Sequence, residues 1–318
     1  MVSATPLPVP SPGELEHIYE DVRNWGRWGD DDERGTLNFL TPEVRARALA
    51  LPRDGIVLSL AHDLAVAPSP ETPEPAQHHM LAAGDARDAS GIPGYEASRD
   101  YFGTAVHGLG ITHVDALCHM FVRGEMYNGV PAQAVRSDGA TRNTLMTLAD
   151  GLVGRGVLLD VPRAHQVEFL EANEAIGIAD LEAAERAQRL AVRSGDILVV
   201  STGRDARRRQ ANGVLNPFTS GLAGLHPECL PWLHDREIAA LGSDGISDGM
   251  PGLGIEGWPF PVHQVGITGM GLHLIDNMNL EGILAACLER RRWEFLLTIA
   301  PIRIPRATGC PVNPIAAF

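Results

Sequence analysis

Residues 107–119 read His-Gly-Leu-Gly-Ile-Thr-His-Val-Asp-Ala-Leu-Cys-His, and this stretch decides how the rest of the chain is interpreted. Neutral imidazoles and a hard carboxylate at this density are typical of a metal site rather than of histidines that hydrogen-bond separately. His113 and Asp115 share one face if the backbone is extended. His119 is four residues beyond Asp115, so a helical turn would bring them together. We therefore predict a strand that runs into a helix and directs these side chains to one point.

The same stretch resembles the signature H-x-G-T-H-x-D-x-P-x-H of the putative cyclase superfamily, the metal-dependent hydrolases that include bacterial kynurenine formamidase and isatin hydrolase. Four residues match it in spacing: Thr112, His113, Asp115 and His119. Ile111 and Leu117 stand where glycine and proline are expected. His107 lies six residues before His113 instead of four. Two extra residues can loop out and still bring His107 to the metal, as in the longer branch of the family.

Further segments resemble the longer members of this family over nearly the whole chain. They lie at residues 25–30, 34–38, 127–129, 195–203, 241–244, 261–263 and 274–277. In the family, the last two segments supply a second histidine and a metal-binding glutamate. These positions hold His263 and Asp276 here, and the aspartate is one methylene shorter than the glutamate.

The resemblance implies an α/β chain with the swivelling β/β/α fold of the cyclase family, in which helices flank a mixed sheet. We expect one domain over residues 1–318, with residues 1–54 as a helical extension packed on it. The resemblance also implies a homodimer or homotetramer.

The ligand types suit zinc, manganese or iron(II), and we expect one or two Mn²⁺ or Zn²⁺ ions. We assign the first metal site to His107, His113 and Asp115. A second ion would be bridged by Asp115 and completed by His119 and Asp276. With one ion only, His119 becomes a proton shuttle. His263 is the other candidate acid or base, and the alternative for it is a helix histidine that faces the core.

These residues predict a hydrolase in which metal-activated water attacks an amide, lactam, lactone or ester carbonyl. The expected substrate is small and cyclic or aromatic. Three aromatic residues are candidates for its binding wall or for ordinary packing: Trp25, Trp28 and Phe102. The first alternative is a cyclase of aromatic natural-product assembly. An alternative of another class is a non-catalytic protein that binds a metal or a ligand.

Composition narrows the remaining function classes. The chain has 318 residues and a net charge of −14, so nucleic acid and anionic membranes are poor partners and a small molecule is expected. All basic residues are arginine, which excludes a Schiff-base lysine and a P-loop lysine. The four cysteines form no C-x-x-C pair, and residues 1–13 do not resemble a signal peptide. We therefore expect a cytoplasmic enzyme.

Periodicity and capping signals predict alternating helices and strands without repeats. We expect helices from the capping box at Ser11 to about residue 25, and over 44–51, 180–192 and 279–291. We expect strands at 56–60, 156–161, 196–201, 238–241 and 295–304. The proline-rich segment 65–97 is predicted to be a loop, with His78 and His79 on its solvated surface.

Three other motifs are formal matches only. Gly245-Ile-Ser-Asp-Gly249 fits the nucleophile elbow around Ser247, but the glycines and prolines that follow exclude the helix that this motif needs. Residues 252–257 fit a dinucleotide fingerprint, but Trp-Pro-Phe-Pro follows where its helix would start. Cys118 is interpreted as a packing residue and not as a nucleophile.

Overall fold

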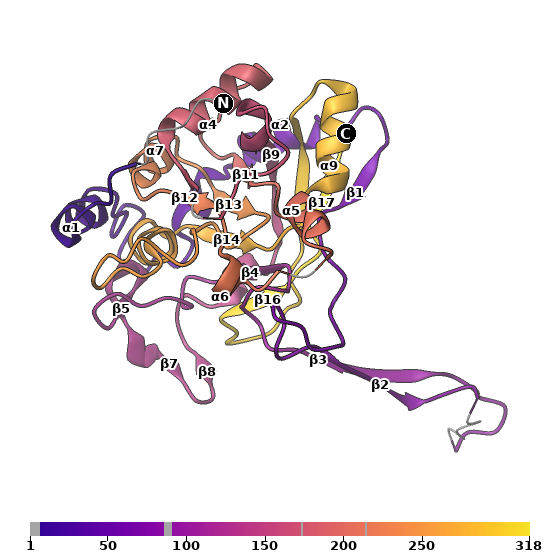
Figure 1. Cartoon of the computed structure of the whole chain (residues 1–318). Coiled ribbons are helices and arrows are strands. Elements are labelled where there is room, and N and C mark those ends of the chain that lie inside the picture. The colour runs from indigo at the N-terminus through magenta and orange to yellow at the C-terminus, as the bar shows by residue number, and fades with distance from the viewer. Residues whose placement is uncertain (1–6, 86–90, 173, 214) are drawn as a thin grey trace.

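The fold is built on one large mixed sheet. The computed structural model describes residues 7–85, 91–172, 174–213 and 215–318. In these residues, nine strands form the sheet in the order β1, β17, β15, β9, β11, β13, β14, β4, β16. Their bounds are, in the same order, Val57–Ser59, Ile315–Ala317, Glu294–Ile299, Leu152–Asp160, Ile197–Ser201, Ala240–Ser243, His273–Asp276, His113–Asp115 and Gly309–Pro311. The predicted α/β fold with a mixed sheet and flanking helices is confirmed (Figure 1).

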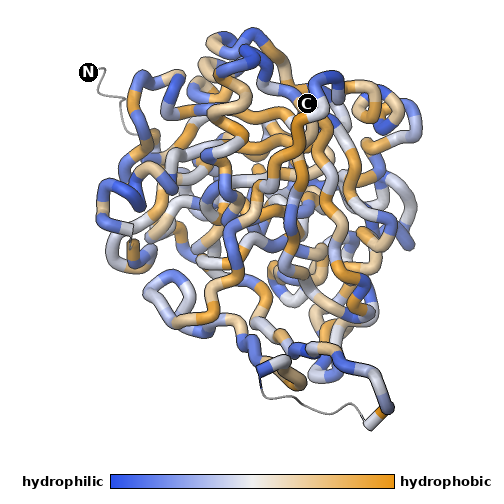
Figure 2. Tube along the Cα trace, turned by 90° about the vertical axis from the view of Figure 1, so that its right-hand side faces the viewer, coloured by the Kyte–Doolittle hydropathy of each residue, from blue (hydrophilic) through white to orange (hydrophobic). Residues whose placement is uncertain are grey.

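The centre of the sheet is parallel and is buried on both faces. Strands β9, β11, β13 and β14 run parallel, whereas β4 and β15 are antiparallel to their neighbours. Alternate residues of β11 belong to two hydrophobic cores, one on each face of the sheet. Leu198 and Val200 pack in one core, and Ile197 and Val199 pack in the other. Continuous apolar runs are typical of strands that are covered on both sides. Figure 2 shows these hydrophobic segments inside the molecule, with hydrophilic segments around them.

Helices cover both faces of this sheet. One core is closed by α1 (Pro12–Asp21), α4 (Ile178–Gln188), α7 (Cys229–Asp235) and the π-helix η5 (Gln264–Met270). The other is closed mainly by α9 (Glu281–Arg290) and α2 (Pro42–Leu49). The remaining helices are short: α3 (Val161–Ala164), α5 (Arg204–Gln210), α6 (Pro217–Ser220), α8 (Pro261–His263), η1 (Gly35–Phe39), η2 (Tyr127–Gly129), η3 (Ala132–Ala134) and η4 (Leu145–Leu148).

The capping residues in the sequence predicted where helices occur more accurately than they predicted the first and last residues of those helices. Ser11 forms the predicted capping box with Glu14 at the start of α1. That helix ends at Asp21, earlier than predicted, because the chain then hydrogen-bonds to a distant segment through Asn24 N and Gly269 O (3.0 Å). The predicted Asp180 cap is wrong by three residues. Gly177 is the N-cap of α4, and the Asp180 carboxylate accepts from its backbone N–H.

A long β-hairpin leaves the body of the molecule. Within the described part of the chain, strands β2 (Gln77–Ala82) and β3 (Arg99–Gly103) pair only with each other and form an arm that projects from the sheet (Figure 1). The prediction of a loop over 65–97 is therefore wrong at β2, and residues 86–90 of it lie outside the described residues. The remaining two-stranded sheets are small: β5 (Glu125–Met126) with β6 (Val130–Pro131), β7 (Val135–Arg136) with β8 (Gly139–Ala140), and β10 (Ala175–Ile176) with β12 (Gly224–Leu225).

None of the helices in the described ranges has both the length and the apolar character that a membrane crossing requires. The predicted absence of a signal peptide concerns residues 1–13, of which residues 1–6 lie outside the described part of the chain.

Candidate metal centre

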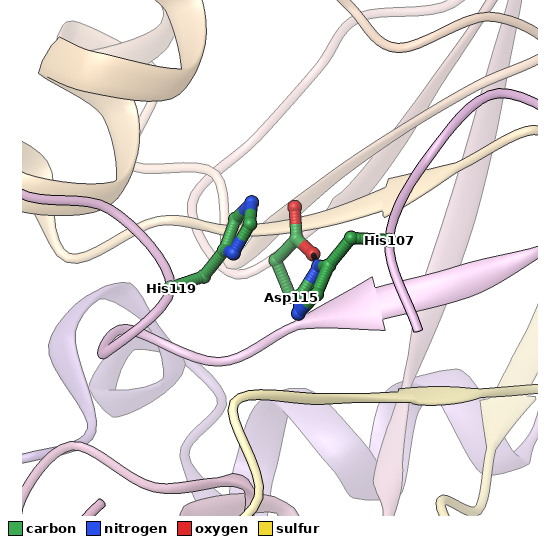
Figure 3. Close-up of side chains that lie close together, drawn as sticks. All are labelled: His107, Asp115 and His119. Carbon is green, nitrogen blue, oxygen red and sulfur yellow. Dashed lines mark hydrogen bonds and ion pairs between the residues drawn. The ribbon is translucent and has the colours of Figure 1, made fainter. Parts of the chain in front are cut away.

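Five of the predicted side chains converge at the end of the sheet where β4 and β14 pair. The potential ligand atoms of His107, Asp115 and His119 lie within 4.8 Å of one another. The same limit holds for His113, Asp115 and Asp276. Asp115 belongs to both groups and lies between them. Figure 3 shows Asp115 on its strand, with His119 on one side and His107 on the other.

Strand register explains this grouping, which differs from the division that the sequence predicted. Antiparallel pairing of β14 with β4 places Asp276 opposite His113, so these two residues are neighbours across the ladder. The chain reverses direction after Asp115, and this places His119 next to His107. The two imidazole rings stack with their centroids 3.7 Å apart. The predicted helix after the strand is wrong. A tight turn takes its place, in which His119 N donates to Ala116 O and Cys118 N to Asn143 O.

The His113 ring is oriented as a metal-binding imidazole is, and the His107 ring faces the same carboxylate. His113 Nδ1 donates to the backbone oxygen of Ile111 at 2.7 Å, and its Nε2 faces Asp115 Oδ1 at 3.4 Å. His107 Nδ1 donates to the same Asp115 oxygen at 2.7 Å. A backbone acceptor on one ring nitrogen, with the other nitrogen aimed at the site, is the usual arrangement around a metal-binding histidine.

Two carboxylate oxygens in this cluster are buried without a hydrogen-bond partner: Asp115 Oδ2 and Asp276 Oδ1. A buried carboxylate oxygen without a hydrogen bond is costly. The two orphaned oxygens and the surrounding imidazoles form an oxygen and nitrogen donor set that suits a divalent cation such as Zn²⁺ or Mn²⁺. The residues present therefore fit the metal that the sequence predicted.

The pKa values of the side chains in the centre show that its carboxylates stabilise a positive charge. Burial opposes a positive charge on His113, but Asp115 and Asp276 raise its pKa to about 9. Burial also opposes a negative charge on Asp115, yet hydrogen bonds from His107 and His113 hold its pKa well below the usual range. Burial lowers the pKa of His119 to about 4, so its ring is neutral at neutral pH. The centre is thus a buried anionic site that favours a cation.

His263 lies beside the two carboxylates and is held by an aspartate that sequence reasoning missed. Its Nδ1 donates to Asp248 Oδ2 at 2.7 Å, while Nε2 lies 3.2 Å from Asp276 Oδ2 and 3.7 Å from Asp115 Oδ2. Asp248 also accepts from the backbone N–H groups of Val262 and His263. An aspartate on one ring nitrogen fixes the tautomer and aims the other nitrogen at the site. His263 thus faces the centre and not an apolar core.

A buried arginine holds the loop that carries His107. The Arg204 guanidinium donates to Leu109 O at 2.7 Å and to Asn277 Oδ1 at 2.5 Å. Asn277 in turn donates to the backbone oxygens of Gly108 and Ile111. These bonds hold the longer connection between His107 and His113, in which His107 itself has a left-handed φ of 73°. The two extra residues of this loop are therefore fixed by a distant side chain.

Arg204→Lys is expected to weaken metal binding about 10- to 100-fold while the protein stays folded. A lysine keeps the charge but has one donor nitrogen in place of the two guanidinium nitrogens that bind Leu109 and Asn277 separately, so the His107 loop is held less well. Isothermal titration of the metal-free protein with Zn²⁺ measures the change. The matched control is Arg207→Lys on the same helix, because Arg207 donates to Ser220 O and Gly221 O and pairs with Glu171, away from the His107 loop. Unchanged affinity in Arg204→Lys would contradict this role.

An apolar wall lies near the centre, on residues that sequence reasoning did not select. Leu222, Ile246 and Met250 form a small cluster, against which Leu109 and Phe260 pack. Leu109 belongs to the His107 loop, and the Phe260 ring lies 6.5 Å from the His263 ring. A cavity of about 160 Å³ adjoins this loop and is lined by residues that include His107, Leu109 and Phe218. Apolar walls beside a few polar groups are typical of small-molecule sites.

The three aromatic residues predicted to bind substrate lie elsewhere. Trp25 donates from its indole nitrogen to Thr268 O and packs on Tyr19. Trp28 packs edge-on against Phe39. Phe102 is 55% exposed on β3 of the arm. The structure does not gather these three side chains around the five candidate ligands, and their part in substrate binding stays a prediction.

Ser247→Ala is expected to leave turnover and metal content unchanged. Ser247 follows a strand, but no helix begins between residues 248 and 260, all of which the structure describes. Its hydroxyl is buried without a hydrogen-bond partner, whereas a nucleophilic serine needs a base within reach. Both nitrogens of His263 face carboxylates instead. Lost turnover at normal metal content would restore the serine mechanism.

Cys118 is fully buried, and burial raises the pKa of its thiol to about 12, which agrees with a packing role. Residues 252–257 contain no helix, as expected for a chance match to the dinucleotide fingerprint.

Comparisons with known proteins agree with this architecture. The family model described as putative cyclase matches residues 57–248, which include His107, His113, Asp115 and His119. A crystal structure of a novel cyclase is 30% identical, with a TM-score of 0.83 over 93% of this chain and 99% of that one. An isatin hydrolase bound to the product analogue thioisatinate is 21% identical, with a TM-score of 0.58 over 85% of this chain and 94% of that one. Isatin hydrolase A from Ralstonia solanacearum is 19% identical, with a TM-score of 0.58 over 82% and 91%. None of the curated proteins matches the sequence.

Proposed function

Because the chain belongs to the putative cyclase family, we propose that it is a metal-dependent hydrolase. Its reaction cleaves the C–N or C–O acyl bond of a small cyclic or aromatic amide, lactam, lactone or ester. The observation that carries the proposal is the pair of orphaned, buried oxygens of Asp115 and Asp276 among three imidazoles. A divalent cation held there would lower the pKa of a water molecule and polarise the substrate carbonyl.

The side chains of the centre divide this work. His107, His113, Asp115, His119 and Asp276 would hold one or two ions, of which Mn²⁺ and Zn²⁺ suit the donors. His263 acts as the general base that takes a proton from the attacking water and returns it to the leaving nitrogen or oxygen. Asp248 keeps the His263 ring in place through Nδ1 and stabilises its protonated form.

Substrate size and polarity follow from the surroundings of the centre. The wall that includes Leu109, Ile246 and Phe260 favours an apolar ring, and the cavity of about 160 Å³ beside His107 and Leu109 offers space for a small molecule. The isatin hydrolase structures share the fold with this chain, and the amide of a fused aromatic ring is consistent with such a wall. Acyl bonds of ring compounds are therefore the first substrates to test.

The alternative is a cyclase, which the family description and the similar novel cyclase structure favour. In that reaction the same five side chains would hold the cation, and His263 would remove a proton next to a carbonyl. A non-catalytic metal-binding protein is the alternative of another class. The His263 ring, which Asp248 holds with its other nitrogen facing the centre, argues against this alternative.

Four free, buried cysteines agree with a cytoplasmic setting.

A substrate panel tests the proposed activity. Protein loaded with Zn²⁺ or Mn²⁺ is assayed against formanilides, aromatic lactams, aryl lactones and a poly-β-keto chain, with acid release followed at constant pH. We expect turnover of at least one lactam, lactone or formanilide. Turnover of the poly-β-keto chain alone would establish the cyclase instead. Failure with every activated amide and ester at full metal loading would contradict the hydrolase.

A further inference from the structure

A second cavity, of about 770 Å³, lies at the carboxyl ends of three neighbouring parallel strands of the large sheet. Asp160 ends β9, Ser201 ends β11, and Asp244 directly follows β13. All three residues line the cavity, whereas none of the five candidate metal ligands does. Ligands of open α/β sheets bind in the crevice outside the carboxyl ends of the strands. The cavity therefore has both the place and the volume that are typical of a small-molecule site.

The register of the strands places these three residues in one row. Asp160 pairs with Ser201 across β9 and β11, and the residue before Ser201 pairs with the residue before Asp244. Leu158 and Val199, two residues before Asp160 and Ser201, belong to the core that α9 covers. Because side chains two residues apart lie on one face of a strand, Asp160 and Ser201 also face α9. The start of α9 forms the opposite wall of the cavity.

Two groups on the inner surface of the cavity lack the partners that burial requires. The Ser201 side chain is fully buried, and its hydroxyl has no hydrogen-bond partner. Asp160 is 8% exposed and accepts from Arg163 N at 3.2 Å, but it forms no ion pair with the described part of the chain. Asp244 differs, because its carboxylate accepts from three backbone N–H groups and one hydroxyl. A buried carboxylate without a cation and a buried hydroxyl without a partner are both costly.

The other charged side chains around the cavity do not supply the missing cation. Five carboxylates and two guanidinium groups line it. The Arg209 guanidinium pairs with Glu168 and Glu281, and so joins α5 to the start of α9, which lies beside it (Figure 1). The charge and the backbone N–H of Arg163 lower the pKa of Asp160 by less than burial raises it. The excess of carboxylates therefore favours a ligand with a positive charge.

Apolar side chains form the rest of the wall. They belong to the segment after β9 and to the start of α9, and they are Pro162, Ala164, Val167, Leu280, Leu284 and Leu288. Val167 and Leu288 are exposed, although both are large and apolar. Apolar walls beside a few buried polar groups are typical of a site for a molecule with an apolar body and one polar end.

We propose that this cavity binds a small organic amine, with its ammonium group at Asp160 and Ser201 and its apolar body against Val167 and α9. An ammonium group has several N–H donors and no acceptor, so it can donate to the carboxylate and to the hydroxyl at once. A bare metal ion is a poorer fit, because these two side chains offer fewer oxygen ligands than Mg²⁺ or Ca²⁺ takes. The proposed hydrolysis uses neither residue, so this inference does not rest on it.

The test is calorimetric titration of the metal-loaded full chain with benzylamine and with cyclohexylamine. The metal is kept in place so that the amines cannot occupy the anionic centre around Asp115. Each amine is compared with the alcohol and the carboxylate of the same ring. We expect at least one amine to bind about 10-fold more tightly than its alcohol, the difference that one hydrogen bond to a charged group makes, and the carboxylates not to bind.

Two variants locate the bound amine. Asp160→Asn keeps the cap of α3 but removes the charge, so it should cancel the preference for the amine over the alcohol. Ser201→Ala should weaken amine binding several-fold without destabilising the ligand-free protein, because the hydroxyl has no partner to lose. The matched controls are Asp180→Asn, whose carboxylate also accepts at the start of a helix, and Ser247→Ala, whose hydroxyl is also buried without a partner. Both controls should bind the amine as the wild type does.

Equal affinity for each amine and its alcohol would overturn the proposal, as would the absence of binding by both amines at concentrations on the order of 10 mM. Amine binding that Asp160→Asn and Ser201→Ala both leave unchanged would place the amine elsewhere on this acidic protein and would also overturn it. Metal content should be normal in both variants. Failure of the protein to hydrolyse any substrate of the panel would contradict the proposed function and leave this result standing.

Discussion

Asp115→Ala is expected to abolish metal binding and turnover together. Asp115 is shared by both groups of candidate ligands, it is 1% exposed, and its Oδ2 has no hydrogen-bond partner. Loss of an outer-shell residue alone typically costs about 10- to 100-fold in metal affinity. Loss of the central ligand should therefore cost more than this, and we expect no bound metal after dialysis and no detectable turnover.

The matched control for this variant is Asp160→Asn. Asp160 is also a buried acid, but it accepts from Arg163 N at the start of α3, a role that asparagine can keep. Thermal unfolding of both variants separates loss of metal from loss of fold. Full activity in folded Asp115→Ala would show that the centre is assigned to the wrong residues.

His263→Gln is expected to lower kcat by roughly 100- to 10,000-fold, the range in which a general acid–base group contributes. Metal content should stay normal, because the five candidate ligands remain. Glutamine can still accept or donate a hydrogen bond near Asp276 but cannot carry the proton. Asp248→Asn should give a smaller loss, since the ring survives and only its orientation and charge are less well held.

Single-turnover kinetics on the metal-loaded variants measure this effect directly. If His263→Gln lost the metal as well as the activity, His263 would be a ligand and not the base. If kcat were unchanged, the proton would be carried by another group. The Ser247→Ala protein serves as the control, because the altered residue directly precedes Asp248 in the chain and has no expected role.

Local sequence signals were enough where structure depends on neighbours in the chain. The apolar run in β11 predicted a buried strand, and the spacing of His113 and Asp115 predicted two side chains on one face of a strand. Both features arise within a few residues. The same reasoning was wrong after Asp115, because Cys118 in the turn there donates its N–H to Asn143 O, and Asn143 lies far along the chain.

Contacts between segments that are distant in the chain could not be predicted from the local sequence. Arg204 holds the His107 loop through Asn277, and nothing near Arg204 in the sequence indicates this. In the sequence, Asp248 stands out only as part of the Gly245–Gly249 motif, the formal match to a serine nucleophile elbow. An aspartate there could have been considered as a partner of His263. The β2 strand of the arm lies in the segment 65–97, whose prolines and weak periodicity predict a loop, because β2 has no alternation of apolar and polar residues.

The central claim is that the cluster around Asp115 holds a divalent cation. Its most direct test is elemental mass spectrometry of tag-free protein purified without chelator, with and without dialysis against Zn²⁺ or Mn²⁺. We predict one or two equivalents of metal in the wild type and none in Asp115→Ala. A wild-type protein that neither carries nor takes up Zn²⁺, Mn²⁺ or Fe²⁺ would contradict the account, and the proposed hydrolase would fall with it.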